Sequence, residues 1–143
     1  MAETTPLRLL AEDADDLAVI SAALQDSIGK IGDISFDARA RRLTLALNRY
    51  RWEAGGKAGE RIRTGLQLGG VLGVKSRKLR RDAKGAVVEL LSITFEPGET
   101  PGGAVVFTFA GGGDLRAEVE CVDLVLADVS PAWPTPRTPT HAD

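Results

Sequence analysis

The chain has 143 residues, a net charge of −2 and a single cysteine, Cys121. A chain of this length buries roughly 68–70% of its unfolded surface as one domain, so it needs no metal or disulfide staple to fold. One cysteine excludes an intramolecular disulfide framework, and we expect a protein of the reducing cytoplasm. The first residues do not have the pattern of an export signal, and no run of 18 apolar residues occurs, so the sequence supports no membrane span.

The first predicted elements are a short strand and one helix. PLRLLA, residues 6–11, is typical of an opening strand, and residues 12–27 predict a helix whose first turn is capped by Asp13. Asp15 and Asp16 favour the positive end of the helix dipole. The apolar residues of this segment fall on one stripe: Leu17, Ile20, Leu24 and Ile28. We therefore expect a helix with one buried face rather than a calcium loop, because the required glycine and closing glutamate are missing.

From residue 31 onward the pattern alternates as in strands. Residues 34–52 predict a hairpin whose second strand places Leu43, Leu45 and Leu47 on one face. Residues 61–74 predict a strand with its apolar residues on one face: Ile62, Leu66, Leu68, Leu72 and Val74. The pattern continues through three further segments: 86–96, 104–109 and 115–129. The last of these also fits a helical stripe, but its β-branched residues favour a strand.

The predicted fold class is α+β, with one N-terminal helix packed on a mainly antiparallel, strongly curved sheet of about six or seven strands. We expect one compact domain over residues 1–130 and a Pro-rich C-terminal tail over 131–143, with Trp133 as its anchor. The glycines between Gly65 and Gly73 match neither a phosphate-binding loop nor a dinucleotide fingerprint. We interpret them as bulges where the sheet bends.

The charges are strongly segregated along the chain. Residues 1–33 hold two Lys or Arg against seven Asp or Glu, residues 34–84 hold fourteen against four, and residues 85–143 hold two against nine. A basic middle segment can attract nucleic acid or acidic lipid, but acidic flanks can also neutralise it within the fold or across an oligomer interface. Because the whole chain is not basic, the internal interpretation is favoured.

The basic residues between 75 and 84 form the candidate anion-binding site. Six of these ten residues are cations, and five of them are the candidate anion-binding residues: Lys75, Arg77, Lys78, Arg80 and Arg81. A solvated strand end and turn is the favoured interpretation of this segment. The sequence RYRW, residues 49–52, also combines basic and aromatic residues as single-strand binders do. On a regular strand, however, Arg49 and Arg51 point away from the two aromatic rings, so nucleic acid is possible but not favoured.

Catalytic and metal sites find little support. The only histidine, His141, lies in the predicted tail, and Cys121 lies within a predicted core strand, where a buried apolar role is expected. Glu118 and Glu120 share a strand face and could perform acid/base chemistry, but the favoured interpretation is a solvated face with cross-strand ion pairs, which needs no chemistry. We predict no catalytic residues, no metal site and no cofactor.

Four stretches carry a resemblance to a known family. They are LRLLAEDADDLAVISAALQDSI at the start, GDISFD and RRLTLALNRYRWE in the first hairpin, and VECVDLVLADVSPAWPTP near the end. The sequence resembles a family of small bacterial proteins classed as a domain of unknown function. The resemblance covers nearly the whole chain and implies a compact bacterial cytoplasmic protein, and it transfers no catalytic residue.

Three functions stay open from the sequence. The first is a non-catalytic interaction or scaffold module that associates with itself or with a protein partner, suggested by the missing catalytic set and the opposed charges. The second is a module that binds nucleic acid or acidic lipid through the basic residues between 75 and 84. The third is a carboxylate-based enzyme that uses Glu118 and Glu120.

Overall fold

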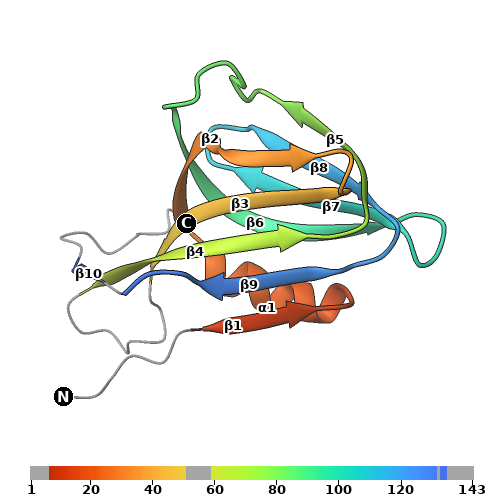
Figure 1. Ribbon diagram of the computed structural model, residues 1–143, viewed down its shortest axis with the longest axis horizontal. Coiled ribbons are helices and arrows are strands. Elements are labelled where there is room, and N and C mark those ends of the chain that lie inside the picture. Colours follow the sequence, from red (N-terminus) through yellow and green to blue (C-terminus); the bar gives the residue numbers. More distant parts are fainter. Residues whose placement is uncertain (1–6, 51–58, 132, 135–143) are drawn as a thin grey trace.

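The computed structural model describes residues 7–50, 59–131 and 133–134. In these residues one helix packs on a ten-stranded antiparallel sheet, so the fold class is α+β as predicted (Figure 1). The elements in chain order are β1 (Arg8–Ala11), α1 (Ala14–Leu24), β2 (Ser27–Asp37), β3 (Arg42–Tyr50), β4 (Glu60–Leu68), β5 (Val71–Arg77), β6 (Val87–Pro97), β7 (Gly103–Phe109), β8 (Asp114–Val119), β9 (Leu124–Asp128) and β10 (Trp133–Pro134).

The strand order differs from the chain order at both ends of the sheet. It runs β1-β9-β4-β3-β2-β6-β7-β8-β5, and the short β10 pairs with the beginning of β4. The consecutive strands β4 and β5 are therefore not neighbours, because the chain crosses from the middle of the sheet to its edge after β4. The edge strands are β1 and β5, and all the pairings are antiparallel.

The helix α1 begins where its capping residue predicts. The Asp13 side chain accepts a hydrogen bond of 2.8 Å from the backbone N–H of Asp16, which satisfies a donor of the first turn. The apolar stripe packs against β1, β3 and β6 through Leu17, Ile20 and Leu24. The prediction that the helix runs to residue 27 is wrong, because Asp26 takes a φ of 65° and the chain turns into β2.

One apolar core lies between α1 and the face of the sheet that it covers. On β3 the predicted inward residues Leu43, Leu45 and Leu47 are all at most 1% exposed. β7 and β8 contribute Phe107, Phe109 and other buried side chains to the same cluster. The alternation of buried and exposed residues on these strands confirms the strand pattern read from the sequence.

The predicted number of strands and the predicted curvature are both wrong. The sheet has ten strands and is not strongly curled. The segment 61–74 is two strands, because the chain turns at Gly69 and Gly70 between β4 and β5, where Gly70 takes a φ of 63°. Leu72 accordingly does not share the buried face and is 57% exposed. These glycines separate strands rather than bend one, although the register shift between Val71 and Gly73 is a bulge.

The C-terminal third also contains one more strand than predicted. The segment 115–129 is β-structure, as favoured, but it consists of β8 and β9 with a turn at 120–123 between them. In the predicted tail, Trp133 and Pro134 pair with Arg61 and Glu60 of β4. The rest of the tail, with His141, lies outside the described residues, as do Arg51 and Trp52. In the part of the chain that the structure describes, no helix is long and apolar enough to cross a membrane.

Candidate functional site

The five predicted anion-binding residues do not converge on one place. Lys75 and Arg77 belong to β5 and line a groove together with side chains of β6, β7 and β8. Lys78 and Arg80 lie in the loop 78–86 that joins β5 to β6, and they line a depression beside the start of β6. Arg81 lies in the same loop but lines a different cavity. Of the five, Arg81 is thus the one with a distinct environment.

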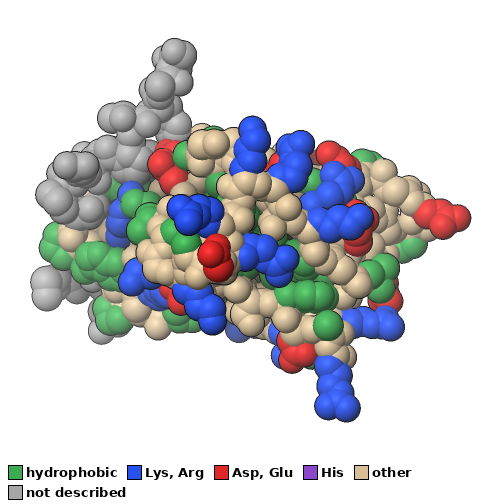
Figure 2. Space-filling model, turned by 90° about the horizontal axis from the view of Figure 1, so that it is seen from above, with side chains coloured by type: hydrophobic (Ala, Val, Ile, Leu, Met, Phe, Trp, Pro, Cys, Tyr) green, Lys and Arg blue, Asp and Glu red, His purple; other side chains and the backbone are tan. Residues whose placement is uncertain are grey.

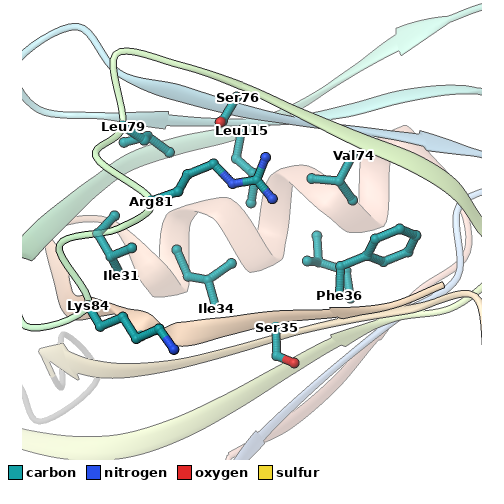
Figure 3. A pocket seen from close by; sticks show the side chains of 12 residues that line it. Ile31, Ile34, Ser35, Phe36, Val74, Ser76, Leu79, Arg81, Lys84 and Leu115 are labelled. Atoms are coloured by element: carbon teal, nitrogen blue, oxygen red, sulfur yellow. The ribbon is translucent and has the colours of Figure 1, made fainter.

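Arg81 lies over a cleft between β2 and β5, which we call the β2–β5 cleft (Figure 3). The cleft has a volume of about 320 Å³. It lies on the inner side of both strands, and the loop 78–86 contributes Leu79 to its wall. Its apolar lining comes from four strands and the loop: Ile31, Ile34, Phe36, Leu43, Val74, Leu79 and Leu115. A cavity of this size and lining is typical of a small binding site.

Two cations stand at the polar side of the β2–β5 cleft. Arg81 and Lys84 both line it and are both solvent-exposed, and in Figure 3 the Arg81 side chain reaches over the cleft toward Val74. In the described residues neither side chain forms a hydrogen bond or an ion pair. Figure 2 looks down on this side of the molecule and shows Lys and Arg side chains spread over it among fewer acidic ones. The two cations are therefore available to an incoming anion.

Backbone hydrogen bonds hold the walls of the β2–β5 cleft in place at two points. At one point Val71 N donates to Arg41 O over 2.9 Å, which ties the start of β5 to the β2–β3 turn. At the other point Gly32 N donates to Lys84 O over 2.8 Å, which ties β2 to the loop 78–86. A Cβ at Gly32 would lie 3.0 Å from that same carbonyl oxygen, so a glycine lets the loop approach the strand closely.

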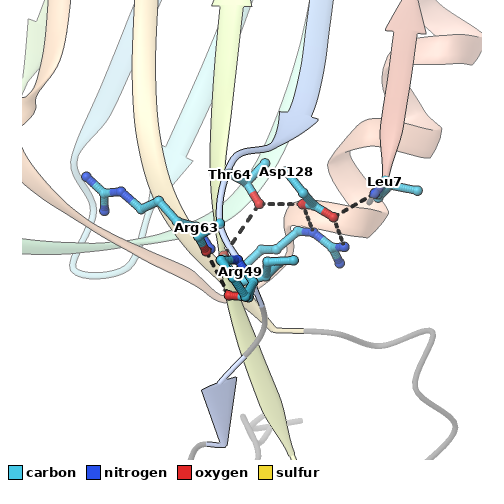
Figure 4. Close-up of polar contacts among 8 residues, drawn as sticks. Leu7, Arg49, Arg63, Thr64 and Asp128 are labelled. Atoms are coloured by element: carbon cyan, nitrogen blue, oxygen red, sulfur yellow. Dashed lines mark hydrogen bonds and ion pairs between the residues drawn. The ribbon is translucent and has the colours of Figure 1, made fainter. Parts of the chain in front are cut away.

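A second polar cluster is buried where the ends of β3 and β9 meet the middle of β4 (Figure 4). The Arg49 and Asp128 side chains are each 1% exposed and form a two-point ion pair, with Nε to Oδ1 and Nη2 to Oδ2 both at 2.8 Å. Asp128 also accepts hydrogen bonds from Thr64 Oγ1 and from Leu7 N, at 2.8 and 2.7 Å. These four bonds occupy the acceptor capacity of the carboxylate, so the cluster is structural rather than a ligand site.

The environment of Asp128 acts on its pKa in two directions. Burial raises the pKa of this carboxyl, because the charged form loses its hydration. The hydrogen bonds from Arg49, Leu7 and Thr64 and the charge of Arg49 act the other way and outweigh burial. The net result is a pKa below the ordinary value of an aspartate, so Asp128 stays ionised at neutral pH.

The sequence analysis missed this cluster, although a signal for it was present. Arg49 continues the inward parity of Leu43, Leu45 and Leu47 on β3, and Asp128 continues the inward parity of β9. A charged residue at an inward position of a strand needs a partner. Two inward charges of opposite sign therefore indicate a buried ion pair, and the structure brings them together because β3 and β9 both pair with β4.

Ion pairs join the oppositely charged segments of the chain within one molecule. Arg41 to Glu120, Arg49 to Asp128 and Arg77 to Asp114 each link the basic middle segment to the acidic C-terminal segment, at 2.6 to 2.8 Å. Arg63 also joins the acidic N-terminal segment through Asp33, at 2.9 Å. The internal neutralisation favoured from the sequence is therefore present, although it leaves Arg81 and Lys84 without acidic partners in the described residues.

The residues considered for catalysis lie in β8 and in the turn that follows it: Glu118, Glu120 and Cys121. Glu118 accepts a hydrogen bond from Arg116 on its own strand, and Glu120 pairs with Arg41 across the molecule. Cys121 is exposed in the turn between β8 and β9, so the prediction of a buried apolar role was wrong because the predicted strand ends before it. In the described residues, no three His, Cys, Asp or Glu side chains gather as a metal site would require.

Comparison with known proteins extends the resemblance seen in the sequence. No curated protein and no solved structure matches the chain significantly. The model of one family, described as a protein of unknown function (DUF2948), matches residues 7–141. This range contains α1 and all ten strands, so the match covers the entire described fold. The chain belongs to the DUF2948 family of proteins of unknown function.

Proposed function

We propose that the protein is a non-catalytic binding module whose ligand carries both a negative charge and apolar groups and lies in the β2–β5 cleft. One observation carries the proposal: two exposed cations without acidic partners, Arg81 and Lys84, stand beside an apolar cavity of about 320 Å³. Sites of this kind use the apolar lining for affinity and a few polar groups for orientation. Charge-assisted hydrogen bonds from a guanidinium suit a carboxylate or phosphate well.

Two alternatives from the sequence have less support. Nucleic-acid binding is favoured by a continuous basic track with exposed aromatic rings. Here the basic residues between 75 and 84 face three different cavities, and Tyr50 is buried with the Arg61 guanidinium 5.9 Å from its ring centre. A scaffold role through opposed charges has less support because ion pairs within the chain already engage many of those charges.

The proposal is tested with simple amphiphiles of opposite charge. We expect decanoate to bind the protein in isothermal titration calorimetry and decyltrimethylammonium, with the same chain length, not to bind. The variant Arg81→Glu/Lys84→Glu should lower the decanoate affinity by about tenfold or more, because each lost charge-assisted contact is worth about 1.5–3 kcal/mol.

A matched control lies in the same loop. The variant Lys78→Glu/Arg80→Glu has the same change in net charge, at two exposed residues that line the neighbouring depression instead of the β2–β5 cleft. We expect it to bind decanoate like the unmodified protein. Equal losses in both variants would indicate a general charge effect, and equal binding of the two amphiphiles would contradict the proposal.

A further inference from the structure

Two strand edges without backbone partners border the β2–β5 cleft. β5 is the last strand of the sheet and pairs with β8 along one edge only. β2 pairs with β6 only over Ser27–Lys30, and its later residues Ile34–Asp37 are paired with β3 alone. The second edge of each stretch is open. In the described residues, the only backbone hydrogen bond on these open edges is the one from Val71 N to Arg41 O.

These edges decide which kind of apolar anion fits best. On a paired strand every second residue directs its N–H and C=O away from its partner, so each open edge presents a row of backbone donors and acceptors. A hydrocarbon chain lying between the two edges would remove water from those groups without replacing its hydrogen bonds. Each group buried in that way costs about 1–3 kcal/mol. A polypeptide in extended conformation replaces the same hydrogen bonds with its own N–H and C=O groups.

We infer that the natural occupant of the β2–β5 cleft is an extended acidic peptide segment of a partner protein, added as a strand along the open edge of β5. The inference rests on the proposed function and names its ligand class. The open stretch of β5, residues 72–77, accommodates about six peptide residues at roughly 3.3 Å each. A strand in this position would lie along the β2–β5 cleft, beside the residues of β2 and β5 that line it.

The lining of the cleft specifies the peptide's pattern. Side chains of a strand alternate between its two faces. The inward ones meet Val74, Ile34 and Leu115, which calls for β-branched apolar residues at alternate positions. The outward side chains of the peptide lie on the solvent side of the cleft. Arg81 and Lys84 are exposed there and have no acidic partners in the described residues. We therefore expect Glu or Asp at the peptide positions between the apolar ones.

The experiment uses a capped seven-residue peptide of alternating Glu and Val, titrated into the full chain. We expect binding that is lost when Lys replaces Glu in the peptide. Binding should weaken by about tenfold or more in Arg81→Glu/Lys84→Glu and stay unchanged in Lys78→Glu/Arg80→Glu. Binding that is equal for the Lys peptide, or equal in the two variants, would overturn the inference.

Two backbone-methylated peptides separate strand addition from simple charge attraction. One peptide is N-methylated at its valines and the other at its glutamates, so each loses the donors of one edge only. We expect at least one of them to bind about tenfold more weakly than the parent peptide. We also expect the amides of residues 72–77 to exchange hydrogen more slowly when the parent peptide is bound. If both methylated peptides bind like the parent, the ligand does not add as a strand and the inference is wrong.

The decanoate titration distinguishes failure of this inference from failure of the proposed function. If decanoate binds and depends on Arg81 and Lys84 while the peptide does not bind, the cleft is a small-molecule site and the peptide inference falls alone. If neither binds, both proposals fall. Peptide binding with the expected dependence on the two cations and on the backbone donors supports both.

Discussion

At the scale of single residues, Arg49 and Asp128 show how the fold tolerates charge inside its core. Arg49 enters the core at the end of β3, where its guanidinium meets a carboxylate held by Thr64 and by the backbone of Leu7. Removing two ions from water is costly, and the cost is recovered only when the geometry is good and the remaining donors and acceptors are satisfied. The carboxylate in this cluster meets that condition, with four hydrogen bonds of 2.7 to 2.8 Å.

The first prediction concerns the loss of one member of this pair. Asp128→Asn leaves the buried Arg49 without its counter-charge, and we expect it to lower the free energy of unfolding by about 3–5 kcal/mol. Urea unfolding followed by circular dichroism measures the change. The double variant Arg49→Met/Asp128→Leu removes both charges, and we expect it to recover most of the loss. A loss below about 1 kcal/mol in the single variant would show that the pair is not important for stability.

The second prediction concerns pH. Because the folded pKa of Asp128 lies below its unfolded value of about 3.9, ionised Asp128 stabilises the fold at pH values above 3.9. This stabilisation disappears as the pH falls from about 4 through the lowered folded value. We therefore expect the melting temperature to fall in this acid range, and to fall less steeply in Asp128→Asn. Parallel acid profiles for the two proteins would assign the acid sensitivity to other carboxylates.

At the scale of elements, glycines determine where strands end and how closely the loop 78–86 lies on β2. Gly70 redirects the chain between β4 and β5, so that β5 becomes the edge strand bordering the β2–β5 cleft. Gly32 has a different role, since it allows the carbonyl oxygen of Lys84 to accept a hydrogen bond at close range. The wall of the cleft therefore depends on the absence of a side chain at this position.

The third prediction compares two glycines beside the cleft. A Cβ at Gly32 would lie 3.0 Å from a backbone oxygen, whereas a Cβ at Gly85 would have no heavy atom within 4 Å. We expect Gly32→Ala to destabilise the protein by about 1 kcal/mol or more and to weaken decanoate binding, because the loop must move. Gly85→Ala should be neutral or stabilising by about 0.4–1 kcal/mol, since it restricts the unfolded chain. Thermal unfolding and calorimetry of the two variants give both quantities, and similar behaviour of the two would contradict the assigned role of Gly32.

The helix and the strands could be predicted from local sequence pattern, but the strands that lie next to one another in the sheet could not. Capping by Asp13, the stripe of α1 and the alternation on β3 are local signals, and each is present in the structure. The place of β5 is not local, because alternation within a strand says nothing about which strand it pairs with. For the same reason the sequence indicated a basic stretch but not that Arg81 would be separated from Lys75 and Arg77. The cleft arises only when β2 and β5 come together.

At the scale of the whole molecule, the segregated charges are brought together by the topology. β3 and β4 carry basic residues and lie between β2 and β9, which carry acidic ones. Pairs such as Arg41 with Glu120 are more than half exposed, and exposed pairs contribute little to stability. Their effect is to neutralise charge locally, and on the face that Figure 2 shows the positive side chains are scattered rather than continuous.

The fourth prediction follows from that scattered surface. Binding of duplex or single-stranded DNA should be confined to low salt and should vanish as salt rises to about 200 mM, because few phosphates can be contacted at once. Arg81→Glu/Lys84→Glu and Lys78→Glu/Arg80→Glu should reduce it equally. Filter binding at several salt concentrations measures this. DNA binding that persists at 200 mM salt and depends on only one of the two pairs would indicate a specific nucleic-acid site.

The pairing of β1 with β9 has a consequence for how the protein is made. Arg8 of β1 pairs with Ala127 of β9, and the Asp128 carboxylate is completed by the backbone of Leu7. At a synthesis rate of about 5–20 residues per second, the ribosome produces Ala127 roughly 6 to 24 seconds after Arg8. Until then β1 cannot pair with β9, and Arg49 has no Asp128 carboxylate to pair with. We therefore expect chains arrested on the ribosome before residue 124 to be cut readily by protease, and the complete fold to form only after β9 has left the ribosome.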